Sequence, residues 1–250
     1  MVNKKTLKTT VYTLLSLVFW IAVWYWAALK INSSVVLPSP KETFKQIIFI
    51  VSNSDFLLIC VNSVFKIFLG ALFGVVIGIL TALCAFFLPP IKYLISPVLS
   101  IIKATPIASF IVLLLIVLGK APVPSITSAL ISMPILFSNV YTALENVDKK
   151  LLEVCEVYSI GFKKRLHYLW IPSIFPHIVS GIKSGIGLSW KAGIAAEVLC
   201  APENSIGLKI HESRIYLETP CLFAWTAIVI VLSICFERLS VLLLKERRRK

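Results

Sequence analysis

The stretch LENVDKKLLEVCEVYSIGFKKRLHYLWIPSIFPHIVSGI, residues 144–182, is the longest polar-rich interruption in a chain that is otherwise mostly apolar. Apolar residues recur at helical spacing within 151–158 and again within 162–170, with charged residues between them. This pattern predicts two short helices, each with an apolar face toward its neighbours and a charged face outward. Pro172 and Pro176 mark the end of the polar segment, so we expect the next long apolar helix to begin only after them.

The composition indicates a membrane protein. Hydrophobic residues make up 58% of the 250 residues and charged residues 15%, and the mean hydropathy is +0.91. Soluble domains average about 45–50% apolar and about 25% charged residues. The length allows several spans of about 20 residues and leaves no room for a second globular domain. We therefore predict an all-α integral membrane protein with a single transmembrane domain over residues 1–250.

Six apolar segments are long enough to cross a bilayer. The first has 19 residues without a charge, which is longer than the apolar part of a typical signal peptide, so we expect it to be retained. The third contains Pro106, which predicts a kink or break, either a tolerated irregularity or a part of a translocation path. The predicted spans are residues 11–29, 62–88, 93–119, 125–143, 177–199 and 221–244.

The basic residues predict the orientation of the spans. Fourteen of the 25 Lys and Arg lie in one set of segments between spans, and six lie in the other set. Because basic residues concentrate on the cytoplasmic side, the first set is predicted to be cytoplasmic, together with both termini. The cytoplasmic set is 1–10, 89–92, 144–176 and 245–250, and the external set is 30–61, 119–124 and 200–220.

Three charged residues lie inside the fifth predicted span. Lys183 is close enough to the cytoplasmic end to extend its amine to the membrane surface. Lys191, beside Trp190, is deeper and is the better candidate to face a translocation path. Glu197 lies near the opposite end, where it is expected to be interfacial or a salt-bridge partner.

Small residues also follow a pattern. Gly70, Gly74 and Gly78 share one helical face, which predicts close packing against another helix, with a path lining as the weaker alternative. None of the six cysteines forms a C-x-x-C pair, so we expect them to act as small apolar residues. Cys200 and Cys221 bracket one predicted external loop, where a disulfide is an alternative.

Residues 144–176 have two possible roles: a basic loop that only sets topology, or a docking element for a partner protein. The segment resembles the EAA loop of binding-protein-dependent ABC importer permeases. In that loop a Glu is followed by two small residues, by Gly six places after the Glu, and then by Leu-Pro. Glu153 and Pro172 hold the Glu and Pro positions with the family's spacing of nineteen residues. The resemblance implies coupling helices that sit in a groove of an ATPase subunit.

Two departures from the EAA pattern matter. Val154 and Cys155 replace the usual two Ala, and Ser159 replaces the usual Gly. We expect Gly161 to take over the turn, which would shift or tighten the break between the two short helices. The candidate coupling residues are Glu153, Val154, Cys155, Glu156, Ser159, Gly161 and Pro172, and the candidate path residues are Lys191, Trp190, Pro106 and Lys183.

The sequence Leu37-Pro38-Ser39-Pro40 predicts an extended turn followed by a short amphipathic helix, with Ser39 as its cap and Pro40 as its first residue. This turn and helix resemble the nitrate/sulfonate/taurine branch of the permease family, and residues 180–201 resemble the family's segment after the EAA loop. The branch implies a small solute such as nitrate, a sulfonate, taurine or a vitamin precursor. The lysine at position 191 and the net charge favour an anion.

The resemblance implies a type I ABC importer permease fold in the bacterial cell membrane, with alternating access. It also implies a second permease copy, two ATPase subunits that bind the ATP, and an extracytoplasmic substrate-binding protein that docks near residues 37–40. No cofactor is expected on this chain, because no G-x-x-x-x-G-K-[ST] motif for nucleotide phosphates is present. We therefore expect a permease subunit and not an enzyme.

Other classes are less well supported. The basic runs lack an aromatic-interleaved face, which argues against nucleic-acid binding. The three histidines are scattered without metal-ligand spacing, and no catalytic constellation for a membrane enzyme is visible. A self-contained secondary transporter or channel is the main alternative, but the sequence shows no internal repeat and no acidic pair suited to a proton relay.

Overall fold

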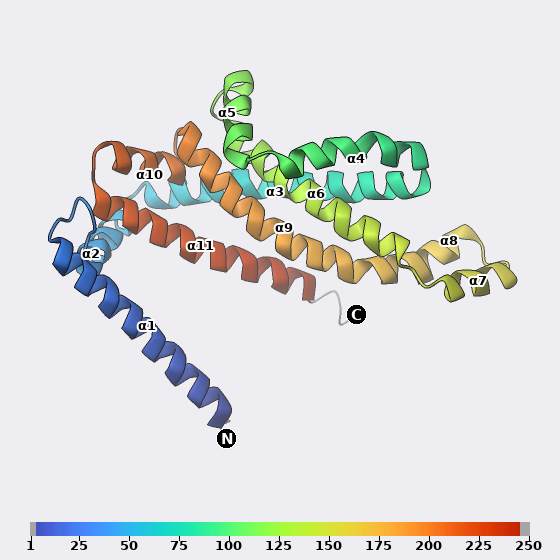
Figure 1. Ribbon diagram of the computed structural model, residues 1–250, viewed down its shortest axis with the longest axis horizontal. Helices are drawn as coiled ribbons and strands as arrows, with labels where there is room; N and C mark the ends of the chain where they lie inside the picture. The colour runs from blue at the N-terminus through green and yellow to red at the C-terminus, as the bar shows by residue number, and fades with distance from the viewer. Residues whose placement is uncertain (1–3, 246–250) are drawn as a thin grey trace. The chain divides into compact units, whose positions relative to one another are not determined.

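The computed structural model describes residues 4–245 and the side chains of residues 11–238, and within this range the regular structure is all helical (Figure 1). Residues 1–3 and 246–250, which belong to the predicted cytoplasmic ends 1–10 and 245–250, lie outside the described residues. The helices are α1 (Lys4–Ile31), α2 (Pro40–Val51), α3 (Phe56–Phe87), α4 (Pro89–Ala104), α5 (Ile107–Leu118), α6 (Val123–Glu145), α7 (Lys149–Val157), α8 (Phe162–Arg165), the π-helical turn η1 (Leu166–Trp170), α9 (Ile171–Cys200), α10 (Ile206–Ile215) and α11 (Thr219–Lys245).

Four helices of the described chain are long and apolar enough to cross a membrane, and a bent pair raises the number to five. The four candidates are Val11–Ile31, Phe56–Phe87, Val123–Glu145 and Thr219–Arg238. They correspond to the predicted spans one, two, four and six. The fifth predicted span falls on α9, which is 30 residues long but is not among the candidates. Its lysines, serines and glycines lower its mean hydropathy.

The third predicted span is broken in two. α4 and α5 are separated by Thr105 and Pro106 and are bent by 106° relative to each other. The predicted break at Pro106 is therefore confirmed. The physical reason is that Pro106 has no N–H for the helical ladder and forces Thr105 into an extended conformation, with ψ of 130°.

The described chain separates into two compact units. One contains residues up to 58 together with 209–230, and the other contains 59–208 together with residues from 231 onward. In the first unit, Ser39 and Glu42 form a capping box at the start of α2, and Pro40 occupies the first turn. This confirms the predicted cap. The Trp24 indole of α1 donates a 3.0 Å hydrogen bond to the Pro38 carbonyl oxygen and stacks on Phe223.

The second unit is built on close packing of α3, α6 and α9. A Cβ on Gly70 would collide with the Ser125 carbonyl oxygen, and one on Gly78 would lie 2.5 Å from the Met133 carbonyl oxygen. The glycine face of α3 therefore packs directly on α6, as predicted. Ser128 of α6 and Ser189 of α9 each donate a hydrogen bond to the other's backbone carbonyl, at 3.1 and 2.8 Å. These bonds satisfy buried hydroxyls between two helices in close contact.

Each end of this second unit gathers segments that the charge pattern assigns to one side. At one end, Lys92 forms an ion pair of 3.3 Å with Glu145, so 89–92 lies beside the start of 144–176. At the other end, the Asn62 amide donates to the Asn204 carbonyl oxygen at 2.8 Å. Val123 shares a buried cluster with Cys200 there. All six cysteines are free in the described structure.

Candidate functional site

The first helix of the candidate coupling loop is α7. Asp148 caps its start by accepting a hydrogen bond of 2.9 Å from the Lys150 N–H. Its end is a Schellman motif, in which the Ile160 N–H bonds to the Cys155 carbonyl and the Ser159 N–H to the Glu156 carbonyl. Ser159 has φ of 50°, in the left-handed region. Ser159 therefore has the left-handed conformation at the position that Gly occupies in the EAA pattern.

The expectation that Gly161 takes over the turn is wrong. Gly161 has φ of −63° and is the residue before α8, in an extended conformation open to any amino acid. The turn is fixed at Ser159 because the Schellman hydrogen bonds require the left-handed residue directly after the last helical positions. The break between the two short helices is therefore not shifted relative to the family pattern.

The second predicted short helix is not separate. α8, η1 and α9 follow one another without a gap from Phe162 to Cys200, so the predicted helix start at about residue 177 is wrong. The Ile171 N–H bonds to the Leu166 carbonyl, five residues back. This wider turn precedes Pro172, whose ring would collide with the carbonyl four residues back in a regular α-helix. The prolines thus loosen the helix locally and do not end it.

α7 has a buried side and a large exposed side. Cys155 is buried in a cluster with the end of α6 and with η1, while Glu153, Val154 and Glu156 are exposed. Val157 is 80% exposed. The outward face is therefore mixed apolar and acidic, and not only charged as the sequence predicted. Exposed apolar side chains gathered beside carboxylates are typical of a surface that binds another protein.

Glu156 also forms a long ion pair with Arg165, at 3.9 Å, which connects α7 to α8. Figure 1 shows α7 and α8 together where α6 ends and α9 begins. Within the described chain, the predicted coupling residues from Glu153 to Gly161 thus lie in one projection at a single end of the second unit, and Pro172 follows in the first turn of α9.

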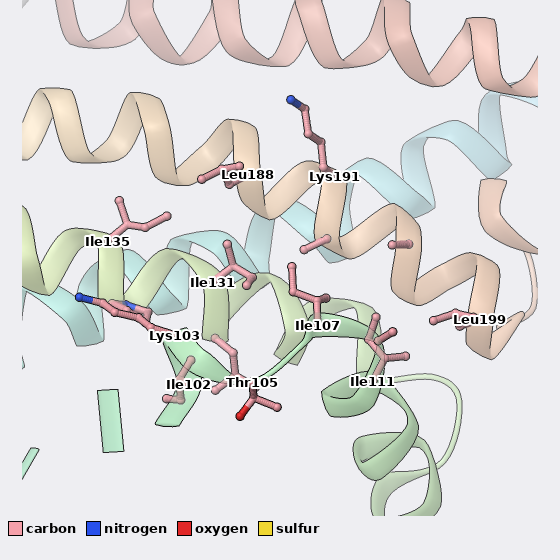
Figure 2. Close-up of a pocket in the computed structure, with 15 residues that line it drawn as sticks. Ile102, Lys103, Thr105, Ile107, Ile111, Ile131, Ile135, Leu188, Lys191 and Leu199 are labelled. Atoms are coloured by element: carbon pink, nitrogen blue, oxygen red, sulfur yellow. The ribbon is translucent and has the colours of Figure 1, made fainter. Parts of the chain in front are cut away.

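The second candidate site is a cavity of about 570 Å³ between the α4–α5 break, α6 and α9. Figure 2 shows the residues that line it, most of them Ile, Leu and Ala. Lys191 contributes from α9, and Figure 2 shows its side chain extending away from Ile107 and Ile131. Lys103 contributes from α4, and its amine donates a 2.7 Å hydrogen bond to the Ser138 hydroxyl. The interior is therefore mostly apolar, and Lys103 and Lys191 are the two charged residues of its lining.

The structure brings only part of the predicted path together. Lys191 lines the cavity, and Pro106 stands between two lining residues, Thr105 and Ile107. Trp190 is 1% exposed and packs against Phe236, with ring centroids 5.4 Å apart, so it lies on another face of α9. Lys183 is exposed and is not among the lining residues. Lys103 was not predicted, although an amine inside an apolar segment was a usable signal.

Glu197 forms no ion pair shorter than 4.0 Å with another described residue. It is fully buried, and its Oε2 accepts hydrogen bonds from the Ser63 hydroxyl at 2.8 Å and the Gly207 N–H at 3.1 Å. The Ser63 oxygen in turn accepts from the Ile206 N–H at 2.9 Å. Sequence reasoning missed Ser63 and Gly207 because nothing in their local pattern marks a carboxylate partner. No group of His, Cys, Asp and Glu suited to a metal ion occurs among the described residues.

The family model described as binding-protein-dependent transport system inner membrane component matches residues 74–249, which include both candidate sites. The chain belongs to this family. The predicted family is therefore confirmed. As a permease component, the chain is a multi-pass protein of the inner membrane and is not itself the ATPase. Membership also implies partners within an ABC transporter complex.

Several curated proteins resemble this permease along most of its length. A Bacillus subtilis protein named as an aliphatic sulfonates transport permease, SsuC, is 26% identical over 211 residues, covering 82% of this chain and 74% of its own. The taurine transport system permease TauC of Escherichia coli is 22% identical over 227 residues, covering 86% and 80%. The riboflavin transport system permease RibX of Chloroflexus aurantiacus is 23% identical over 149 residues, covering 59% and 55%.

Proposed function

We propose that this permease is the transmembrane subunit of an ATP-driven importer for a sulfonate- or taurine-type solute that an external binding protein delivers. The observation that carries the proposal is the compact projection formed by α7, α8 and η1. It carries an exposed apolar and acidic face at the end of the second unit, at the positions of the family's coupling loop. A loop that only sets topology has no need for a capped helix, a Schellman end and exposed valines.

The proposed architecture has six spans in one transmembrane domain of the type I importer fold, with both termini cytoplasmic. Support comes from the four candidate spans, the broken α4–α5 pair and the length of α9. The ion pair between Lys92 and Glu145 also supports it, because it joins two segments that the charge pattern assigns to the cytoplasm.

The proposed partners are a second copy of the permease, two ATPase subunits and an extracytoplasmic binding protein. The ATPase would bind the exposed face of α7, with Glu153 and Val154 in the contact and ATP held by the ATPase alone. The binding protein would dock near the Leu37–Pro40 turn, whose geometry is fixed by the Trp24 hydrogen bond and by the capping box at Ser39. Each permease copy would contribute one projection, and alternating access would follow from movement of the two projections.

The solute proposal draws on the cavity beside the α4–α5 break. Its interior is mostly apolar, and two lysines, Lys103 and Lys191, are among the residues that line it. Such a lining suits an anion that carries an apolar body, as an alkanesulfonate does, better than a small inorganic anion such as nitrate. The names of two similar permeases, for aliphatic sulfonates and for taurine, agree with this choice.

Uptake into proteoliposomes tests the proposal. The permease is reconstituted with its ATPase and binding protein, and uptake of taurine, butanesulfonate, nitrate and riboflavin is measured with and without ATP inside. We expect ATP-dependent uptake of taurine or butanesulfonate. Uptake driven by an ion gradient without ATP would overturn the importer and favour a secondary transporter. ATP-dependent uptake of riboflavin alone would overturn the solute class and leave the importer intact.

A further inference from the structure

A cluster of aromatic rings lies directly beneath the proposed coupling projection. Trp170, the last residue of η1, is 8% exposed. Its ring lies 5.0 Å from that of Phe86 and 6.2 Å from that of Phe87, between centroids, at the end of α3. Phe87 in turn lies 6.0 Å from Phe162, the first residue of α8. Rings from the projection therefore meet rings from a predicted span.

The cluster continues into α6. The Phe86 ring lies 6.4 Å from Tyr141, in an edge-to-face arrangement. Tyr141 stacks on Phe137 at 5.5 Å. The Lys92 amine of α4 lies 4.7 Å from the centre of the Tyr141 ring. The same few side chains therefore contact the projection, α3, α4 and α6.

This arrangement determines what a movement of the projection does. Protein interiors are close-packed and nearly incompressible, so a displaced ring displaces the rings that it touches. Trp170 also belongs to the π-helical turn, where the helix already departs from regular geometry, and such turns are frequent at functional sites. A shift of α7 and η1 would pass through the Trp170–Phe86 contact to the end of α3.

We infer that Trp170 and Phe86 are positioning residues that transmit movement of the coupling projection to the spans. They touch neither the solute nor the ATPase. This inference rests on the proposed importer function and adds to it a separation of two roles within one loop. The exposed face of α7 binds the ATPase, and the buried rings convert that binding into movement of α3 and α6.

The π-helical turn supplies a matched control. Tyr168 lies two residues before Trp170 and is 75% exposed, so it belongs to the outer side of the same turn. Truncating Tyr168 removes an exposed ring and leaves the cluster untouched. The substitutions Trp170→Leu and Phe86→Leu remove the ring contact but keep an apolar side chain, which reduces the risk of an unfolded protein. Trp170→Phe keeps a ring at the position.

The experiment measures three quantities for the complex of each variant: retention of the ATPase on the tagged permease, the rate of ATP hydrolysis, and solute uptake. The ratio of solute taken up to ATP hydrolysed is the decisive quantity, because a residue with a purely structural role would not change it. We expect Trp170→Leu and Phe86→Leu to retain the ATPase and to lower this ratio by about 3- to 30-fold. Trp170→Phe and Tyr168→Leu should stay within about twofold of the wild type.

The double variant completes the test. If the two rings act through their mutual contact, Trp170→Leu combined with Phe86→Leu should lower the ratio no further than the worse single variant does. A ratio equal to that of the wild type in variants that retain the ATPase would overturn the inference. A double variant whose loss in this ratio is the product of the two single losses would also overturn it. Loss of both the ATPase and transport in the single variants would overturn it as well. A wild-type permease that retains no ATPase would instead overturn the proposed function itself.

Discussion

The Ser63 hydroxyl of α3 donates a 2.8 Å hydrogen bond to the Glu197 carboxylate of α9, at a position where both side chains are fully buried. The same carboxylate oxygen accepts the Gly207 N–H. One side chain thus joins α3, α9 and the start of α10 within the second unit.

Removal of this carboxylate would leave two buried donors unpaired. We expect Glu197→Ala to lower the free energy of unfolding by about 1–3 kcal/mol. Glu197→Gln keeps an acceptor oxygen for both donors and should cost less. Thermal unfolding of the purified permease in detergent measures the difference. Equal midpoints for the wild type and both variants would show that the hydrogen bonds contribute nothing to stability.

The glycine face of α3 allows a second test. Gly70→Ala would place a methyl group against the Ser125 backbone of α6, which cannot move without displacing the helix. We expect a loss of about 1–3 kcal/mol in unfolding free energy. Val76→Ala, on the same helix at an exposed position, is the control and should cost less. The measurement is again thermal unfolding, and equal losses would mean that the close approach of α3 to α6 is wrong.

The turn after α7 gives a third prediction. Ser159 has φ of 50°, a conformation that costs a residue with a side chain about 1 kcal/mol relative to glycine. Ser159→Gly should therefore increase the protection of residues 149–160 from amide hydrogen exchange, and Ser159→Val should decrease it. Gly161→Ala is the control, because its backbone is in an ordinary extended conformation. A larger effect at Gly161 than at Ser159 would place the turn where the sequence had suggested.

The cap of α2 predicts a pH dependence. Hydrogen bonds from the Ser39 backbone N–H and hydroxyl hold the pKa of Glu42 below its ordinary value of 4.5. Because the folded pKa is the lower one, the stabilisation is complete above the ordinary pKa and is lost as the pH falls through the folded value. Amide exchange of residues 40–51, corrected for intrinsic rates, should differ between the wild type and Glu42→Gln at neutral pH. The difference in exchange between the two proteins should shrink in acid. A difference that stays constant with pH would mean that the Glu42 carboxylate does not cap the helix.

The sequence predicted what depends on composition and on local chemistry. Apolar runs identified four spans, Pro106 identified the break, and Ser39 with Pro40 identified the start of α2. These features follow from hydrophobicity and from backbone rules that act within a few residues.

The remaining features depend on contacts between residues distant in the sequence. The partner of Glu197 is Ser63, 134 residues away, so no local pattern could predict its burial. The sequence at Pro172 predicts a helix end, because a π-helical turn that accommodates the proline has no sequence signal of its own. Trp190 likewise packs against Phe236 and does not line the cavity, a placement that depends on a residue 46 positions away.

The central claim is that the exposed face of α7 binds an ATPase, and charge reversal tests it most directly. The tagged permease is purified with its ATPase as the wild type, as Glu153→Arg, and as Glu203→Arg. The last reverses an exposed charge at the opposite end of the second unit. We predict that the wild type and Glu203→Arg retain the ATPase, and that Glu153→Arg loses it while reaching the membrane in equal amount. Retention by Glu153→Arg at the level of the wild type would contradict the claim.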